Sequence, residues 1–515
     1  MVKRLYCLTI IVTLIFLSCT NSSLPLIGGE ESEFGKYADS LNIDAQLSYL
    51  HTILSSDSSK SKSDIAVREY YDSLYSTGVV SGLWFSDKGI STEADEMLNF
   101  LSSELPNIGF KPSAFLVDAI ERDLAMLRNL SLDSTHVDIN EALVRLDYNL
   151  SKAYVHYTTG MRYGFVRPDK LLNKLYFRKE RGSWAHLFDY DIVPPDYKLS
   201  VEKIATDDRM DYFRSSTPKA SKVYEALKKE YLGVTDTTKR RKLLVSMERC
   251  RWSIRHPEQA NRKILVNLPA QQLWTLSPSS HDSMRICCGA WETKTPLLCS
   301  EISYMQVNPE WSLPPKIVES DFARHVGDSA WFARHRYFVV DRKTGDTLNI
   351  ASMGRSSLSN QRLRFVQRGG ANNSLGRIVF RFPNNFSIYL HDTNTRGVFS
   401  RERRTVSHGC VRVAKPFELA CFLLPDIDEW TRDRIRISMD IPPVTERGIK
   451  YLQKHTASPR PLRLLDYHGI KPKVPIYIVY FTAYPNPITG MVEYWPDFYG
   501  YDKPICRAMQ HLLRN

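Results

Sequence analysis

The pattern of apolar and polar positions changes character halfway along the chain. From about residue 34 to residue 260, apolar residues recur at intervals of three and four, as in "TEADEMLNFLSSEL" and "SAFLVDAIERDLAMLRNL". This spacing places the apolar side chains on one face of a helix. Asp138 is positioned to cap a further helix that continues as "INEALVRL". We therefore predict a mainly helical unit over 34–260, and it contains no evident catalytic cluster.

From about residue 261 the pattern becomes typical of strands. "RKILVNLPAQQLWTL" is rich in β-branched and aromatic residues, and Pro269 marks a turn between two strands. "SMRICCGAW" predicts another strand, and "GRIVFRFPNNFSIYLHDT" predicts two more that are separated by "PNN". The expected fold class is therefore α+β, with a mainly helical N-terminal scaffold domain followed by a β-rich domain over 261–440.

Residues 311–370 interrupt the strand pattern. This stretch holds Pro314 and Pro315, several arginines and the pair Gly369-Gly370. We predict an irregular insertion there. Long loops in compact domains are often functional or mobile, so both a lid and a simple surface excursion remain open.

The remaining segments are predicted to complete the β-rich domain. "KPFELACFLL" indicates a short helix that begins near Pro416. Residues 441–515 are expected to form a C-terminal extension that packs on the β-rich domain. Within it, Val474 to Asn486 is a strongly β-type run that we expect to return to the same sheet, and the tail ends in a short helical pattern.

The N-terminus has the pattern of an export signal. Lys3 and Arg4 precede an apolar run from Leu5 to Leu17, which is too short for a standard membrane span. We expect residues 1–18 to be a signal peptide of the lipoprotein type, because "FLSC" resembles a bacterial lipoprotein box in which Cys19 becomes lipidated. A simple cleaved signal and an uncleaved anchor remain open. Residues 19–33 would form a tether.

That prediction places the protein on the periplasmic side of a bacterial cell envelope, attached to a membrane through an N-terminal lipid. The composition agrees with a soluble globular body, since 43% of the 515 residues are hydrophobic and 24% are charged. The formal net charge is +12, which favours anionic surfaces and carboxylate-rich polymers. No compact Lys/Arg block with interleaved aromatic residues indicates a nucleic-acid site.

Nine cysteines are present, and their pairing cannot be read from the sequence. Cys287 and Cys288 are adjacent, and Cys299 and His281 lie nearby in the sequence, as ligands of a zinc site could. The spacing fits no CxxC pattern, and adjacent residues of a strand point to opposite faces. Packing is the favoured role for these cysteines, and no metal or other cofactor is expected.

The candidate chemistry lies in "HDTNTRGVFSRERRTVSHGCVRV", which contains His391, His408 and Cys410. The thiolate is the reactive form of cysteine, and positive neighbours lower the pKa of a thiol. We therefore expect an ionised Cys410 beside Arg412 and the upstream arginines, which are Arg401, Arg403 and Arg404. A histidine can take the thiol proton, and backbone N–H groups at a glycine turn can stabilise an oxyanion.

His391 ends a predicted strand, and Cys410 follows 19 residues later. The loop between them can bring both side chains to one face of the sheet. Such a set of groups would perform acyl transfer. A lone cysteine near a histidine is nevertheless more often structural, so the composition of this segment leaves that alternative open.

The motif "HDTN…SHGCVR" resembles the signature of the L,D-transpeptidases with a YkuD-type catalytic domain. "IYLHDT", "ILVNLPAQQLWTL", "MQVNPEWSLPPKI" and "NSLGRIVFRFPN" are most similar to the large YcbB-like branch. The resemblance covers about 261–500, and "GMRYGFVRPDKL" and "SMERCRWS" extend it into the helical half.

This resemblance implies a role for each residue of the segment. Cys410 would be the nucleophile and His391 the general base. His408 and Gly409 would help to form the oxyanion site. Ser407 would position neighbouring groups, and Arg412 would order the loop or bind a substrate carboxylate.

The resemblance also implies a reaction. Cys410 would attack the third residue of a peptidoglycan tetrapeptide stem and release D-alanine. An amine of an acceptor stem would then resolve the thioester and form a 3→3 cross-link, without metal or nucleotide. If water replaced the amine, the protein would be an L,D-carboxypeptidase or another cysteine peptidase or amidase. A non-catalytic wall-binding lipoprotein is the third alternative, and partner proteins are unknown.

Two positions depart from the pattern of the family. Asn394 replaces the usual proline after "HDT", which should alter the turn more than the chemistry. The interval 215–245 is too short for the peptidoglycan-binding module that the YcbB-like branch commonly carries. We therefore assign substrate capture to the insertion at 311–370 and to the basic surface.

Overall fold

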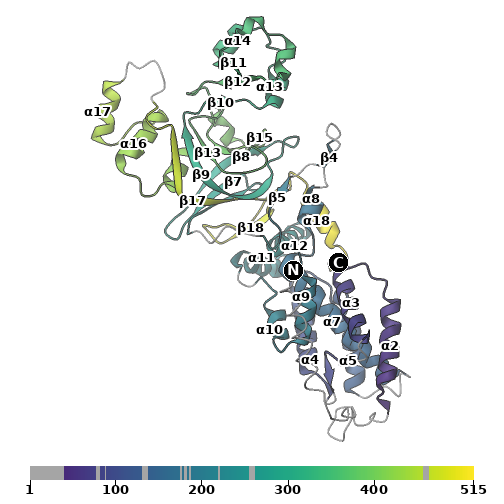
Figure 1. Ribbon diagram of the computed structural model, residues 1–515. Helices are drawn as coiled ribbons and strands as arrows, with labels where there is room; N and C mark the ends of the chain where they lie inside the picture. Colours follow the sequence, from purple (N-terminus) through teal and green to yellow (C-terminus); the bar gives the residue numbers. More distant parts are fainter. Residues whose placement is uncertain are drawn as a thin grey trace, which may run out of the picture.

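The computed structural model describes residues 40–514, except for 77–81, 87–88, 130–136, 174–176, 179–182, 185–186, 219–220, 255–260 and 456–462. The predicted signal peptide, Cys19 and the tether lie outside the described residues. Within the described part, no helix combines the length and the apolarity needed to cross a bilayer. The chain forms an elongated molecule with a helical unit at one end and a β-rich unit at the other (Figure 1).

The helical unit is built around the long helix α7 (Ile139–Tyr163), which is capped by the side chain of Asp138 as predicted. α7 packs against α2 (Ile43–Ser56), α3 (Lys62–Ser76) and α5 (Val117–Arg128). The remaining helices of this unit are α4 (Thr92–Asn107), α8 (Pro168–Asn173), α9 (Tyr197–Glu202), α10 (Arg209–Arg214), α11 (Lys222–Gly233) and α12 (Thr237–Arg251), with short strands β1 (Phe85–Ser86), β2 (Gly89–Ile90), β3 (Phe177–Arg178) and β4 (Ser183–Trp184).

The β-rich unit is a closed barrel. Its strands follow the order β13–β14–β16–β8–β7–β6–β17–β9, and a pairing between β13 and β9 closes the ring. The bounds are β6 (Lys263–Asn267), β7 (Gln272–Leu276), β8 (His281–Gly289), β9 (Leu297–Val307), β13 (Ile378–Arg381), β14 (Leu390–His391), β16 (Val411–Val413) and β17 (Tyr467–Val479). Alternate residues of these strands form one buried apolar core inside the barrel.

The strand pattern of the sequence is confirmed at most positions. β6 and β7 are antiparallel neighbours on either side of Pro269, and helix α15 (Pro416–Leu423) begins where predicted. β17 returns to the sheet and lies between β6 and β9. Strands β9 and β16 of the barrel were not predicted, and neither was β5 (Phe188–Asp189), which comes from the helical half and pairs in parallel with β9.

The prediction of an irregular insertion at 311–370 is wrong. This segment folds into a three-stranded sheet and two helices, with its own apolar core around Phe322, Phe332 and Phe365. Pro314 and Pro315 do not break the structure. They begin helix α13, because proline is well tolerated in the first turn of a helix. The elements are β10 (Trp311–Ser312), α13 (Pro315–Asp321), α14 (Ser329–Arg334), β11 (Tyr337–Asp341) and β12 (Leu363–Gln367).

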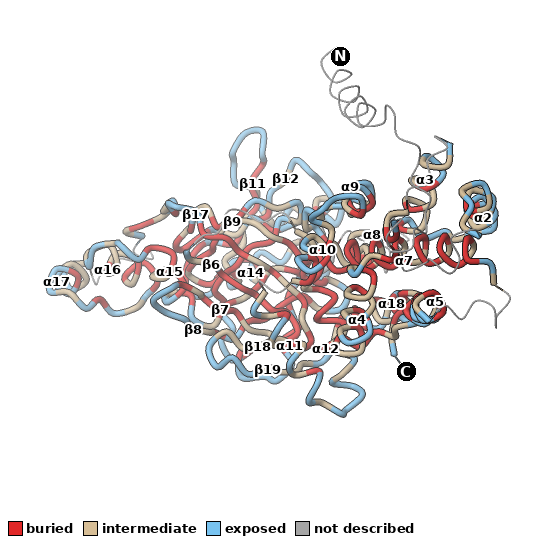
Figure 2. The backbone as a smooth tube through the Cα atoms, turned by 90° about the horizontal axis from the view of Figure 1, so that it is seen from below, coloured by how far each residue is buried: buried red, intermediate tan, exposed pale blue. Residues whose placement is uncertain are grey.

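The C-terminal part joins the two units. Helices α16 (Glu429–Ser438) and α17 (Glu446–Lys454) project from the barrel, and the hairpin β18 (Ala483–Pro485) and β19 (Val492–Tyr494) follows β17. Helix α18 (Asp502–Met509) packs against α12, and the side chain of Leu512 is buried in the core of the helical unit. Figure 2 shows buried backbone in α7 and in the barrel strands, while α2 and α17 lie at the exposed ends.

Candidate active site

The strand register brings Cys410 and His391 to the same face of the sheet. β14 and β16 are parallel neighbours in which Leu390 lies beside Val411 and His391 beside Arg412. Leu390 and Val411 are fully buried inside the barrel. Their neighbours Cys410 and His391 therefore point to the outer face of the barrel, because successive side chains of a strand alternate. The prediction that the loop brings both residues to one face is confirmed.

The turn before Cys410 is held by hydrogen bonds from its own side chains. Gly409 has a φ of +116°, a conformation that L side chains rarely adopt. The Ser407 hydroxyl donates to the Cys410 carbonyl at 2.5 Å and accepts from the Gly409 N–H at 3.2 Å. Thr295 donates through its hydroxyl to the Gly409 carbonyl at 2.8 Å. Ser407 and Thr295 therefore fix the position of the sulfur.

The expected lowering of the thiol pKa is wrong. Burial raises the pKa of Cys410 to about 11, although Tyr389, Arg381 and Arg412 act in the opposite direction. The side chain of Arg404 is buried elsewhere, where its guanidinium donates to the carbonyls of Ile286 and other residues. Desolvation thus exceeds the effect of the positive neighbours, and Cys410 is a neutral, half-buried thiol at rest.

His391 is also neutral at rest. His391 is only 4% exposed. This burial, together with the neighbouring Arg412, lowers the pKa of the imidazole to about 3. The Nδ1 atom of His391 is buried and has no hydrogen-bond partner among the described residues. A buried nitrogen without a partner is costly, so it is a good candidate for an atom that acts in a reaction.

Three residues near the sulfur were not singled out in the sequence. The ring of Tyr389 contacts the ring of His391 edge-on, with 5.7 Å between centroids, and the Arg381 guanidinium lies 4.3 Å from the centre of the Tyr389 ring. Trp311, from the insertion, packs with Cys410 against the cluster that contains Tyr389. Tyr389 precedes His391 by two residues, so the alternation of the predicted strand was a signal that could have placed it on the same face.

Two cations beside the sulfur have unused hydrogen-bonding capacity. The Nε atoms of Arg381 and Arg412 are buried and lack a partner within the described part of the chain, and neither guanidinium forms a salt bridge there. Burial lowers the pKa of Arg412 below its usual value. A guanidinium recognises carboxylates through paired hydrogen bonds. Both side chains are therefore suited to bind an anionic group of a ligand.

The structure separates the two histidines of the motif. The His408 side chain is exposed and forms no hydrogen bond with another described residue, whereas His391 is buried beside the sulfur strand. The Gly409 N–H is already bonded to Ser407. Among the hydrogen bonds of the described residues, none is donated by the Cys410 N–H. The Cys410 N–H is therefore a backbone donor with free capacity at this turn.

The other cysteines show no sign of a second centre. All seven cysteines in the described ranges are free thiols, and no group of three or more His, Cys, Asp or Glu side chains there could hold a metal ion. Cys287 lies in a small outer cluster with Val398 and Phe399, while Cys288 lies in the barrel core. These two neighbours point to opposite faces of β8, as predicted.

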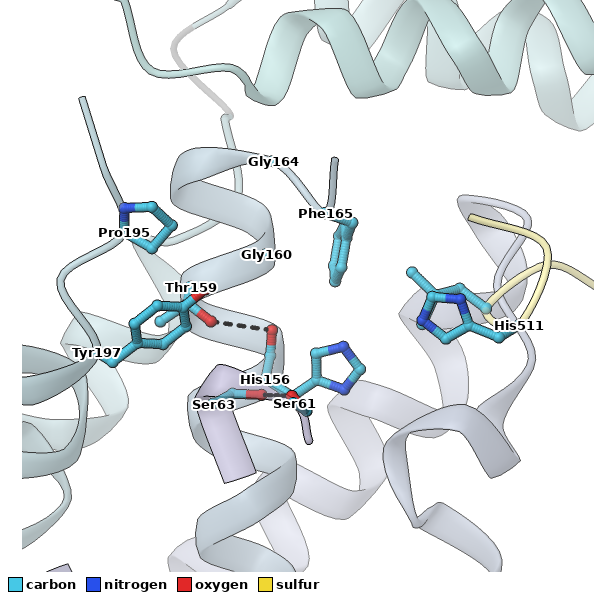
Figure 3. Close-up of a pocket in the computed structure, with 11 residues that line it drawn as sticks. Ser61, Ser63, His156, Thr159, Gly160, Gly164, Phe165, Pro195, Tyr197 and His511 are labelled. Atoms are coloured by element: carbon cyan, nitrogen blue, oxygen red, sulfur yellow. Dashed lines mark hydrogen bonds between the residues drawn. The ribbon is translucent and has the colours of Figure 1, made fainter. Parts of the chain in front are cut away.

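A cavity of about 150 Å³ lies in the helical unit, far along the chain from the sulfur (Figure 3). Its walls include Ser61, Ser63, His156, Thr159, Phe165 and His511. The two serine hydroxyls are hydrogen-bonded to each other at 2.7 Å, and burial lowers the pKa of His156 to about 4. The cavity has no cysteine in its wall, so the nucleophilic chemistry points to Cys410 instead.

A half-buried thiol and an imidazole whose Nδ1 atom lacks a partner among the described residues lie on one face of a closed barrel. Residues 261–437 match the family described as the L,D-transpeptidase catalytic domain, called YkuD, and residues 69–230 match a family described as a scaffold domain. The β-rich unit is therefore an L,D-transpeptidase catalytic domain, which follows a helical scaffold domain. The family resemblance and the α+β fold class inferred from the sequence are confirmed.

A relative supports the same assignment. A protein of Haemophilus influenzae with the name "Putative L,D-transpeptidase" is 25% identical over 366 residues, which are 69% of this chain and 70% of that protein. Membership of the YcbB-like branch stays a prediction.

Proposed function

We propose that this protein is a peptidoglycan L,D-transpeptidase that forms 3→3 cross-links through a thioester on Cys410. The family match of residues 261–437 supports the class of enzyme. The observation that carries the proposal is the register of β14 and β16, which puts the thiol of Cys410 beside the strand of His391, whose Nδ1 atom has no partner among the described residues.

In the first half of the proposed reaction, the Cys410 sulfur attacks the carbonyl of the third residue of a donor stem. The thiol proton passes to the imidazole of His391 as the new bond forms. The negative charge on the carbonyl oxygen is met by the Cys410 N–H, on the turn that contains His408 and Gly409. The C–N bond then breaks, and the amine of D-alanine leaves with the proton from His391.

In the second half, the side-chain amine of an acceptor stem attacks the thioester. His391 takes a proton from that amine, and the departing sulfur recovers its proton from the imidazole. Arg412 and Arg381 would bind carboxylates of the stems, since their Nε atoms have no partner within the described residues. Trp311 touches the Tyr389 cluster, which supports the role of the insertion in substrate capture. These steps use no metal and no nucleotide.

The test is incubation of the full-length protein with purified disaccharide-tetrapeptides, followed by mass spectrometry. We expect a 3→3 dimer and an equal amount of D-alanine. Cys410→Ala should lower the rate by about 10³-fold or more, because the nucleophile is lost. Cys421→Ala, which alters a half-buried thiol in α15, is the matched control and should keep full activity. D-alanine release without a dimer would instead identify an L,D-carboxypeptidase, and a dimer formed by Cys410→Ala would refute the mechanism.

The proposal includes export and attachment to a membrane on the periplasmic side of a bacterial envelope. It rests on residues 1–19 of the sequence, where the charged start, the apolar run and Cys19 follow one another. Metabolic labelling with a fatty acid tests it. We expect label in the wild type and none in Cys19→Ser, and an unlabelled wild type would leave no basis for the lipid.

A further inference from the structure

The strand pairings place five residues in one straight row across the outer face of the barrel. The pairing of Leu390 with Val411 puts Tyr389 beside Cys410, and the pairing of β13 with β14 puts Arg381 beside Tyr389. Arg381 lies opposite Tyr304 on β9, and Tyr304 lies opposite Gly469 on β17. The row therefore runs from the sulfur through a tyrosine, an arginine and a second tyrosine to a glycine.

The far end of the row is an exposed aromatic surface. Tyr304 is 37% exposed, and Tyr467, which lies two residues before Gly469 on β17, is 59% exposed. The two rings lie 6.0 Å apart between centroids. At Gly469 an added Cβ would meet no atom within 4 Å, so the space beside Tyr304 is open. Met305, which follows Tyr304, and Ile470, which follows Gly469, lie in the barrel core, so the residues before them point outward. The tyrosine pair thus faces solvent, next to the row that begins at the sulfur.

The row from Cys410 to Tyr304 is slightly longer than the three residues of a donor stem that precede the scissile bond. Neighbouring strands lie about 4.8 Å apart, so three steps from Cys410 to Tyr304 cover about 14 Å. Three extended residues span at most about 10–11 Å. In the proposed reaction the sulfur attacks the third residue of the stem. If the stem lies along the row, its first residue would end about 3–4 Å short of Tyr304, so the sugar to which that residue is attached would reach the tyrosine pair.

We propose that Tyr304 and Tyr467 bind the glycan sugar that carries the donor stem. This inference rests on the proposed function and adds a subsite to it. The apolar face of a sugar ring packs on the face of an aromatic ring, and the polar edges of both remain in water. Arg381 lies between the sugar site and the sulfur, where it can hold a carboxylate or a carbonyl of the stem.

The experiment compares two donors that differ only in the sugar, a disaccharide-tetrapeptide and the free tetrapeptide, with one fixed acceptor. We measure kcat/KM for D-alanine release. Tyr304→Ala and Tyr467→Ala should each lower the value for the sugar-bearing donor by roughly 3- to 10-fold, the size of one aromatic contact, and leave the value for the free peptide within about 2-fold. Tyr304→Phe and Tyr467→Phe should retain the wild-type preference, because the ring face is kept.

Tyr75→Ala is the matched control, since Tyr75 is a half-buried tyrosine in helix α3 of the helical unit. It should change neither value. The sugar site would be overturned if the alanine variants lowered kcat/KM equally for both donors, or if they left the ratio of the two kcat/KM values unchanged. The proposed function would stand in either case.

A binding measurement separates the two proposals. The stem-free disaccharide is titrated into Cys410→Ala protein with and without Tyr304→Ala, and binding is followed by calorimetry. Weaker binding to the double variant supports the sugar site even if the wild type released no D-alanine. Equal binding to both proteins would refute the sugar site on its own.

Discussion

The Cys410 thiol and the His391 imidazole are both uncharged at rest, because burial disfavours the charged form of each. A resting thiolate–imidazolium pair would require the thiol pKa to lie below that of the imidazole. Here the order is reversed, with pKa values of about 11 and about 3. The thiolate is therefore expected to form as the substrate is attacked.

This order of pKa values predicts the pH dependence of alkylation. Only the thiolate reacts with iodoacetamide, so the rate at Cys410 should rise about tenfold per pH unit between pH 7 and pH 10. Peptide mass spectrometry of quenched samples gives the rate for this residue alone. A plateau that begins below pH 7 would show a resting ion pair instead. Arg412→Met should lower the rate at pH 9, because this cation lowers the pKa of Cys410.

At the scale of an element, the end of β14 is held by a corner in which the backbone at Gly376 packs against Asp392. A side chain at position 376 would disrupt this corner. Gly376 has a φ of +65°, and a Cβ at this position would lie 2.5 Å from the side chain of Asp392. The buried Asp392 carboxylate accepts from the Arg377 N–H at 2.9 Å and from the Arg396 guanidinium at 2.8 Å. Since Asp392 directly follows His391, this corner sets the position of the imidazole.

Gly376→Ala should therefore reduce both stability and activity. The left-handed backbone alone costs about 1–2 kcal/mol with a side chain, and the contact with Asp392 adds to this. We expect a lower urea midpoint and a fall in D-alanine release of about 10-fold or more. Gly397→Ala is the control, because a Cβ there meets no atom within 4 Å. Equal behaviour of the two variants would contradict the role of the corner.

The elements differ in how far the sequence revealed them. The alternation around Pro269 and before His391 was sufficient to predict strands, because a half-buried strand has a period of two. The prediction of an irregular insertion fails because Pro314 and Pro315 resemble helix breakers, although they start a helix. The prediction of a lowered thiol pKa fails for a different reason. Charges near Cys410 can be read from the chain, whereas burial depends on strands that are distant in sequence.

At the scale of the whole molecule, a buried ion pair links the helical unit to the C-terminal segment. Arg249 of α12 and Asp502 of α18 lie 2.7 Å apart, and both side chains are almost fully buried. The hydroxyl of Thr482, beyond the end of β17, donates to the second oxygen of Asp502 at 2.6 Å. These contacts hold α12 against α18 and against the segment that follows β17. The helical unit and the β-rich unit are therefore expected to unfold together.

Arg249→Met should lower the free energy of unfolding by about 3–5 kcal/mol, because it leaves the Asp502 carboxylate buried without a cation. Thermal unfolding followed by circular dichroism measures the loss. Lys450→Met removes an exposed ion pair with Glu446 on α17 and should change the midpoint by less than a degree or two. If the two variants unfolded at the same temperature, the Arg249–Asp502 pair would not fasten the units.

The last strand of the barrel along the chain is β17, which lies between β6 and β9, and β6 is synthesised about two hundred residues earlier. A nascent or truncated chain that lacks this strand has an open sheet and no enclosed core behind the cysteine face. The active site is therefore expected to form only after the last strand of the barrel has been synthesised. A fragment that ends before β17 would contain His391 and Cys410 but would lack the closed barrel that positions them.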